Sequence, residues 1–474
     1  MLFTEPVFFL FFAAVLAAAW GTRSNRSRKL CLLAASYLFY AAWDWRFLSL
    51  ILISTLVDFG VGRGLASAHG PESGRRRALL VLSLVVNLGL LGVFKYYGFF
   101  VESAVGLLSA LGLEPAARVP EIVLPVGISF YTFQTLSYTI DVYRGELEPV
   151  RSLSDFALFV AFFPQLVAGP IVRAASFLPQ LERRPHLEDV AFRRHLTLFL
   201  IGFAKKACIA DNLAPFVDAV YAAPQTFDAL SAWTATALYA IQIYCDFSGY
   251  TDMAIACAGL LGYRLVKNFD FPYLARSVSE FWHRWHISLS TWLRDYLYIP
   301  LGGNRGTRLA THRNLMITMV LGGLWHGAAW TFVVWGALHG VALVAHREWR
   351  RRIAPRLPEA LRLGVAAGAL AHALTLGWVL LTWIFFRAQS FSDAATLARA
   401  FLTFQSPGPR SLDPALLLLP AVLGLAHWLS ARRPLERSVE RLPDWAFAGA
   451  YGSAAAFVVF FLPLRSDPFI YFQF

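Results

Sequence analysis

The chain is dominated by apolar runs that are separated by short basic loops. Nine such runs lie at 7–20, 47–61, 78–93, 196–204, 235–245, 315–335, 365–386, 416–429 and 446–464. Hydrophobic residues make up 57% of the chain and charged residues only 15%, whereas a soluble domain is about a quarter charged. A helix that crosses a bilayer needs ~20 apolar residues, and several runs are shorter. The sequence therefore predicts an all-α polytopic membrane protein, a single domain over 1–474, with tilted, broken or re-entrant helices.

The basic loops predict how the chain crosses the membrane. They lie at 22–29, 63–77, 183–195, 303–313, 345–362 and 432–441, and the net charge is +12. Lys and Arg gather in cytoplasmic loops, so the charge indicates topology rather than nucleic-acid binding. The N-terminus is then predicted to lie on the side of the membrane opposite the cytoplasm. No basic segment precedes the first run, so we expect an uncleaved helix rather than a signal peptide. Residues 314–345 must leave the cytoplasmic side and return to it, because basic loops flank them at both ends, so they form a re-entrant pair or two short helices.

His326 is a polar residue within the apolar run at 315–335. No Asp, Glu, Lys or Arg occurs from Leu315 to Leu338. Counting from Asn314, next to a basic loop, His326 is ~18 Å along a helix, near the middle of a hydrocarbon core that is ~30 Å thick. Burial there favours the neutral imidazole, which is able to act as a general base. The alternative is a hydrogen-bonded core histidine.

Residues 280–305 form the densest polar segment, with two histidines, three tryptophans, three arginines and two acids. Such polarity is costly in a membrane and is usually retained for function. His283 and His286 are three residues apart and would share one helix face. Without a third ligand nearby this spacing is a weak metal signal, and we expect no metal. The alternatives are an interfacial aromatic helix and a catalytic or orienting role for His286.

Two carboxylates lie in the apolar segment 244–252. Asp246 and Asp252 each need a partner, because an unpaired buried charge is costly. Arg284, Arg294 and Lys267 are candidate partners, and a structural ion pair competes with a direct role in chemistry. The four cysteines (Cys31, Cys208, Cys245 and Cys257) show no ligand spacing, so we expect free thiols. Nucleotide-binding glycine motifs and a GxSxG elbow are absent from the sequence, and we expect no bound cofactor.

The segment 281–305, beginning Phe-Trp-His-Arg-Trp-His and ending Ile-Pro-Leu-Gly-Gly-Asn-Arg, resembles the signature of the membrane-bound O-acyltransferase superfamily, and more narrowly its bacterial alginate O-acetylation branch. Further matching motifs lie at 124–134, 163–171, 246–252, 267–273, 324–331, 383–388 and 468–474. The resemblance implies a ring of transmembrane and re-entrant helices around a central tunnel. It places the principal catalytic histidine at His326 and a second at His286. Many relatives of this branch have arginine where this chain has His283. The candidate substrate contacts are Trp325, Trp285, Arg284, Asn304, Arg305, Asp246 and Gln134.

The resemblance implies a membrane O-acetyltransferase. It would move an acetyl group from a cytoplasmic thioester donor, acetyl-CoA, across the inner membrane for O-acetylation of an exopolysaccharide such as alginate. The expected partners are the donor, a periplasmic acetyltransferase of the serine-hydrolase type and, indirectly, the polysaccharide. Transfer of D-alanyl or another acyl group to teichoic acid, peptidoglycan or cellulose is an alternative. A non-enzymatic transporter is another, although paired half-repeats, which many transporters show, are not seen in the sequence.

Overall fold

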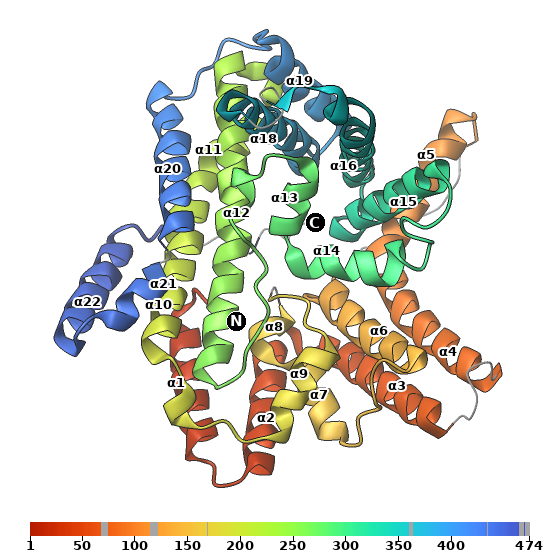
Figure 1. The fold of residues 1–474 in the computed structure, drawn as a ribbon, viewed down its shortest axis with the longest axis vertical. Coiled ribbons are helices and arrows are strands. Elements are labelled where there is room, and N and C mark those ends of the chain that lie inside the picture. The colour runs from red at the N-terminus through yellow and green to blue at the C-terminus, as the bar shows by residue number, and fades with distance from the viewer. Residues whose placement is uncertain are drawn as a thin grey trace. The chain divides into compact units, whose positions relative to one another are not determined.

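A computed structural model describes residues 1–67, 74–113, 122–167, 169–359, 364–433, 435–463 and 469 (Figure 1). Within these ranges the regular structure is helical, apart from one bridge between Phe227 and Arg410. The described helices include four stretches that are long and apolar enough to span a membrane: Asn25–Ser67, Gly74–Ala110, Val365–Arg387 and Pro414–Arg432. The predicted all-α membrane fold is confirmed, while the central tunnel stays a prediction. The terminal motif at 468–474 lies outside the described residues, except for Phe469.

The helices gather into two compact units. One comprises 1–192 with 253–266, and the other comprises 193–252 with 267–474. One boundary falls inside the long helix α12 (Ala229–Leu260). The prediction of a single domain over 1–474 remains a prediction.

The first unit contains nine of the described helices. They are α1 (Pro6–Gly21), α2 (Asn25–Asp44), α3 (Leu48–Ser67), α4 (Gly74–Leu91), α5 (Tyr97–Ala110), α6 (Ile128–Arg144), α7 (Leu153–Ala161), α8 (Phe163–Leu166) and α9 (Ala174–Glu182). Helix α6 packs against α3 and α4 and is buried along most of its length. Gly127 precedes α6 with φ +75°, and a Cβ there would meet the Leu166 carbonyl oxygen at 2.5 Å. Only glycine allows that turn and that close approach.

A buried carboxylate joins three helices of this first unit. Asp58 Oδ1 accepts hydrogen bonds from Ser83 and, at 3.0 Å, from Thr139 Oγ1. Asp58 Oδ2 accepts one from Asn87 Nδ2 at 2.8 Å. Buried polar groups need such partners, so the cluster sets how α3, α4 and α6 pack. The sequence-derived candidate Gln134 also lies buried on α6.

The second unit carries the motifs at 246–252, 281–305 and 324–331. Its helices are α10 (Phe192–Phe203), α11 (Asp211–Ala222), α12, α13 (Val278–Arg284), α14 (Ile287–Leu293), α15 (Arg308–His326), α16 (Trp330–Glu348), α18 (Val365–Arg387), α19 (Phe391–Thr403), α20 (Leu418–Arg432), α21 (Leu435–Ser438) and α22 (Asp444–Phe460). A π-helical turn, η4 (Ala204–Ala210), links α10 to α11, and another, η7 (Arg294–Tyr298), follows α14.

Helices α15 and α16 form a close hairpin, as two helices that leave and return would, while the path of residues 314–345 through a membrane stays a prediction. Each helix has 19 residues, so they are longer than the short helices expected. A Cβ on Gly323 would meet the Phe332 carbonyl oxygen at 2.3 Å, and one on Gly336 would meet the Met319 carbonyl oxygen at 2.2 Å. The two glycines therefore allow the backbones to touch, as small residues do between membrane helices.

The hairpin also changes the placing of His326 along its helix. Thr307 Oγ1 accepts a hydrogen bond from the Ala310 N–H at 3.2 Å, and this cap starts α15 at Arg308 rather than at Asn314. His326 is the last residue of α15, so it lies ~27 Å from the start of the helix at 1.5 Å per residue. The helix thus begins inside the basic loop rather than at Asn314, while the depth of ~18 Å, counted as helical rise from Asn314, stays a prediction.

Candidate active site

His326 lies buried at the tip of the α15–α16 hairpin, within a shell of aromatic rings. This shell includes the rings of Trp325 at 5.0 Å, Trp335 at 5.1 Å and Phe386 at 5.4 Å between centroids. These rings come from α15, α16 and α18. Only 2% of His326 is exposed, so any reaction at its imidazole takes place in a site largely shielded from water.

His286 is the second histidine of this site. Its ring centroid is 6.2 Å from that of His326 and 5.8 Å from that of Trp325. His286 caps α14 with φ +44°, a left-handed conformation that is uncommon for a residue other than glycine. Its Nδ1 accepts a hydrogen bond from the Leu289 N–H at 3.2 Å. The neutral ring therefore carries its proton on Nε2, which is a donor.

The expectation that His283 and His286 share a helix face was wrong. Helix α13 ends at Arg284, and the chain turns before α14 begins at Ile287. His283 remains on α13, where it is exposed and its Nδ1 lies 2.6 Å from the Ser279 carbonyl oxygen. The left-handed residue at 286 breaks the helical register, so His283 is exposed and His286 is fully buried.

Tryptophans enclose the two histidines. Trp335 and Trp383 stack at 5.8 Å, and Trp285 lies 5.0 Å from Trp383. All three are fully buried, and among the described residues none accepts a hydrogen bond from their indole N–H groups. A buried N–H normally finds an acceptor in protein, water or ligand. These donors fit a site that takes a ligand with carbonyl or hydroxyl oxygens.

A third buried histidine, His339, supports this shell. Its Nδ1 accepts a hydrogen bond from Trp282 Nε1 at 3.3 Å, and its Nε2 lies 3.1 Å from Thr382 Oγ1. The Thr382 hydroxyl donates to the Val379 carbonyl oxygen, so it accepts from His339. The His339 ring also packs 4.9 Å from Trp335, which contacts His326. The sequence did not lead us to predict a role for His339. The signal that could have indicated one is its position directly after the uncharged run at 315–338.

Neighbouring residues hold the polar candidates Arg284 and Asn304 in place. Arg284 pairs with Glu280 at 2.8 Å and donates to the Asp270 carbonyl oxygen at 3.1 Å. Asn304 Oδ1 accepts from the Tyr298 hydroxyl at 2.7 Å and from Arg347 at 2.9 Å.

Asn304 and Arg305 are exposed, on a loop that turns through positive φ at Gly302, Gly303 and Gly306. This loop joins η7 to α15. The structure therefore gathers Trp285, His286, Trp325 and His326 at one site, and it places Asn304 and Arg305 on an exposed loop.

Asp246 and Asp252 pair with lysines that the sequence analysis did not consider. Lys206 Nζ lies 2.6 Å from Asp246 and 2.7 Å from Asp211, and all three side chains are buried. Lys205 pairs with Asp252 at 2.7 Å. The predicted pairing of Asp246 and Asp252 with Arg284, Arg294 or Lys267 was wrong. These three cations instead pair with Glu280, Asp295 and Asp270. The π-helical turn η4 supplies both lysines. Such turns are rare insertions that re-aim side chains, and no sequence signal marked this one.

Together, the apolar helices and the buried histidine pair define a helical membrane protein with an internal histidine site. A model of the MBOAT family, the membrane-bound O-acyltransferases, matches residues 149–382. The probable alginate O-acetylase AlgI of Azotobacter vinelandii is 45% identical over 85% of this chain and 78% of its own. The probable alginate O-acetylase AlgI of Pseudomonas aeruginosa is 43% identical over 85% of this chain and 75% of its own.

A peptidoglycan O-acetyltransferase of Helicobacter pylori is 36% identical over 79% of this chain and 73% of its own. The chain therefore belongs to the membrane-bound O-acyltransferase family. It is an acyltransferase, and the alternative of a non-enzymatic transporter is set aside.

Proposed function

We propose that the chain moves an acetyl group from a cytoplasmic thioester, acetyl-CoA, across the inner membrane for O-acetylation of alginate. The observation that carries this proposal is the 45% identity to a probable alginate O-acetylase over 85% of the chain. The buried His286–His326 pair, with ring centroids 6.2 Å apart, supports it because acyl transfer to a hydroxyl needs a base and an oxyanion donor.

His326 is the general base in this mechanism. The imidazole takes the proton of an acceptor hydroxyl as the oxygen attacks the thioester carbonyl. The tetrahedral intermediate then collapses, the C–S bond breaks, and the departing thiolate takes the proton from the imidazolium. The aromatic shell of Trp325, Trp335 and Phe386 excludes water, so the thioester is protected from hydrolysis.

His286 acts as a donor to the reacting oxygen. Its Nδ1 accepts from the Leu289 N–H, so Nε2 carries the proton and is the donor of the neutral ring. It would orient the acceptor or stabilise the oxyanion; one such donor is worth ~3–4 kcal/mol in the transition state. The indole N–H groups of Trp285 and Trp335 would add further donors beside it.

The two ends of the reaction lie on opposite sides of the membrane in this proposal. The exposed loop with Asn304 and Arg305 belongs to the basic segment at 303–313, on the face where Lys and Arg gather. Arg305 would attract the CoA phosphates. Arg308 is a weaker candidate because it pairs with Glu348 at 2.8 Å. The acceptor would be a periplasmic partner of the serine-hydrolase type, which passes the acetyl group to the polysaccharide.

O-acetylation of peptidoglycan is the second candidate function. The similarity to the peptidoglycan O-acetyltransferase of Helicobacter pylori supports it, at 36% identity. The same histidine pair would serve both reactions, because the chemistry of the donor and of the attacking hydroxyl is unchanged.

Expression in an alginate-producing bacterium that lacks its own acetylase tests both candidates. The O-acetyl content of alginate and of peptidoglycan is measured by NMR at equal membrane abundance of each variant. We expect acetylated alginate with the unchanged chain and none with His326→Ala. The matched control is His283→Ala, an exposed histidine on a neighbouring helix, which should retain acetylation. Acetylation of peptidoglycan alone would replace the first candidate with the second, and acetylation of neither would refute both.

A further inference from the structure

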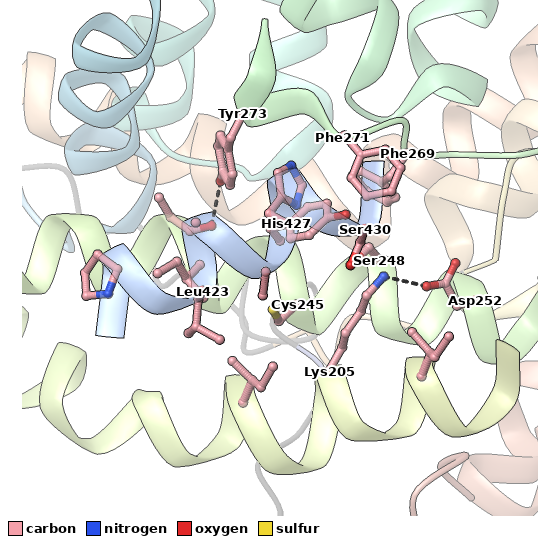
Figure 2. A pocket seen from close by; sticks show the side chains of 18 of the residues that line it. Lys205, Cys245, Ser248, Asp252, Phe269, Phe271, Tyr273, Leu423, His427 and Ser430 are labelled. Atoms are coloured by element: carbon pink, nitrogen blue, oxygen red, sulfur yellow. Dashed lines mark hydrogen bonds and ion pairs between the residues drawn. The ribbon is translucent and has the colours of Figure 1, made fainter. Parts of the chain in front are cut away.

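A cavity separate from the histidine pair lies in the second unit, between α10 with η4, α12, α18 and α20 (Figure 2). We call it the lateral cavity. Its volume is about 430 Å³, within the range of ~300–1,000 Å³ that is typical of ligand sites. The lining along α12 runs from Ala237 to Asp252. Fifteen residues of helix span ~22 Å, so the cavity is long rather than round.

One end of the lateral cavity is aliphatic and lies in the middle of two candidate membrane spans. Leu376 and Leu380 line it from Val365–Arg387, and Leu423 lines it from Pro414–Arg432. Ile209 and Ile241 complete this end. At that level of a membrane protein the surrounding medium is hydrocarbon, so an acyl chain is the ligand that matches the wall.

The other end is polar and carries both signs of charge. Lys205 and Asp252 form an ion pair there at 2.7 Å, and their side chains remain 24% and 22% exposed. Figure 2 shows this pair beside Ser248 and Ser430. Ser430 is close to the end of α20 and of its candidate span, so this end approaches the membrane interface, where polar head groups lie.

Lys267 also lines the lateral cavity but is paired with Asp270 at 2.6 Å, so the Lys205–Asp252 pair selects the class of head group. A purely anionic ligand would meet the Asp252 carboxylate, and a purely cationic ligand would meet the Lys205 ammonium. A zwitterionic head group satisfies both, with phosphate toward Lys205 and ammonium toward Asp252. His427 also lines the lateral cavity. Its Nε2 is buried and makes no hydrogen bond with the described residues, so it is a further polar group for a ligand.

We propose that the lateral cavity binds one glycerophospholipid with a phosphoethanolamine head group. The lipid's acyl chain lies between α12, α18 and α20, and its head group lies at Lys205 and Asp252. Aromatic residues separate this lipid from the histidine site. Phe269 lines the lateral cavity and lies 5.0 Å from Trp285 and 6.4 Å from His286. The proposal concerns lipid binding and does not depend on which polymer is acetylated.

A cavity-filling variant and a matched control are available on two exposed helices. Gly424 lines the lateral cavity, and a Cβ there would meet nothing within 4 Å. Gly424→Phe therefore places a ring in open space without a backbone clash. Gly449 on α22 is equally open and exposed but does not line the lateral cavity. Gly449→Phe thus controls for adding a phenyl ring to an exposed helix.

The experiment uses the full chain in lipid nanodiscs with a trace of phosphatidylethanolamine that carries a photoreactive diazirine in mid-chain. Cross-linked peptides are mapped by mass spectrometry after illumination. We expect labels at Leu376, Leu380 and Leu423, about tenfold weaker in Gly424→Phe and unchanged in Gly449→Phe. The double variant Lys205→Met/Asp252→Asn, which removes both charges together, should also weaken labelling.

The same diazirine on phosphatidylglycerol, an anionic lipid, should label the lateral cavity more weakly. Equal labelling by both lipids, or labels spread evenly over outward helix faces in every variant, would overturn the proposal. Particles containing two chains, with α20 protected from the probe, would assign the lateral cavity to a second copy and would also overturn it. Each variant is first checked for a monodisperse elution profile.

Discussion

His339 offers a test of whether the aromatic shell around His326 depends on a hydrogen-bonded brace. His339→Phe keeps a ring beside Trp282 and Trp335 but loses the bonds to Trp282 Nε1 and Thr382 Oγ1. Hydrogen bonds between membrane helices average ~0.6 kcal/mol, with a maximum of ~1.7. Loss of both hydrogen bonds in His339→Phe is therefore predicted to lower the free energy of unfolding by about 1–3 kcal/mol.

His339→Ala removes the ring as well. Truncation of a large buried side chain to alanine costs about 3–5 kcal/mol because a cavity is left. The ring packs 4.9 Å from Trp335 and 5.1 Å from Trp282, and an alanine methyl group reaches neither. Since Trp335 also contacts His326, the alanine variant should lower kcat for acetyl transfer more than it raises the KM for the donor.

The assay is thermal unfolding of detergent-purified variants, followed by single-turnover acetyl transfer. Thr382→Val, alone and with His339→Phe, completes a double-mutant cycle for the Thr382–His339 bond. Equal unfolding temperatures for the unchanged chain and the alanine variant would refute the brace. A full loss of activity in His339→Phe without any loss of stability would instead indicate direct chemistry at His339.

Three further outcomes follow from the second unit. Lys206→Met should lower the free energy of unfolding by about 3–5 kcal/mol, because two buried carboxylates lose their cation. Adding Asp246→Asn to the same chain should restore part of that free energy, and chemical unfolding measures both changes. Gly323→Ala should abolish folded protein on size exclusion, since its Cβ meets a backbone oxygen at 2.3 Å. Gly377→Ala, in the interior of α18 with open space around the added Cβ, should instead raise stability by up to about 1 kcal/mol, because alanine favours a helix over glycine. His286→Ala should slow acetyl transfer by about 10²–10³-fold, measured at saturating donor, as removal of an oxyanion donor does.

Much of the fold followed from the sequence because hydrophobicity and loop charge act locally. The uncharged run around His326 predicted a buried histidine, and the charge pattern predicted the hairpin at 314–345. The start of α15 was misplaced because the capping residue Thr307 lies within a basic segment. Thr307 Oγ1 accepts a hydrogen bond from the Ala310 N–H, and this cap starts the helix within that segment.

The remaining features depend on tertiary contacts that spacing does not reveal. Asp246 pairs with Lys206, forty residues earlier in the chain, through a π-helical turn. His286 takes a left-handed conformation that separates it from His283, although a regular helix would have placed them together. The role of His339 depends on the meeting of α13, α16 and α18 at its ring, which no local pattern in the sequence indicates.

The most direct test of the account is acetyl transfer by purified protein in liposomes, from radiolabelled acetyl-CoA on the cytoplasmic side to the proposed periplasmic partner on the opposite side. The account predicts turnover by the unchanged chain and a loss of about 10²–10⁴-fold in His326→Ala, the range for removal of a general base. Binding of acetyl-CoA, measured separately by equilibrium dialysis, should stay within about twofold, a change of less than ~0.5 kcal/mol. Turnover by His326→Ala at the rate of the unchanged chain would contradict the assignment of His326 as the base.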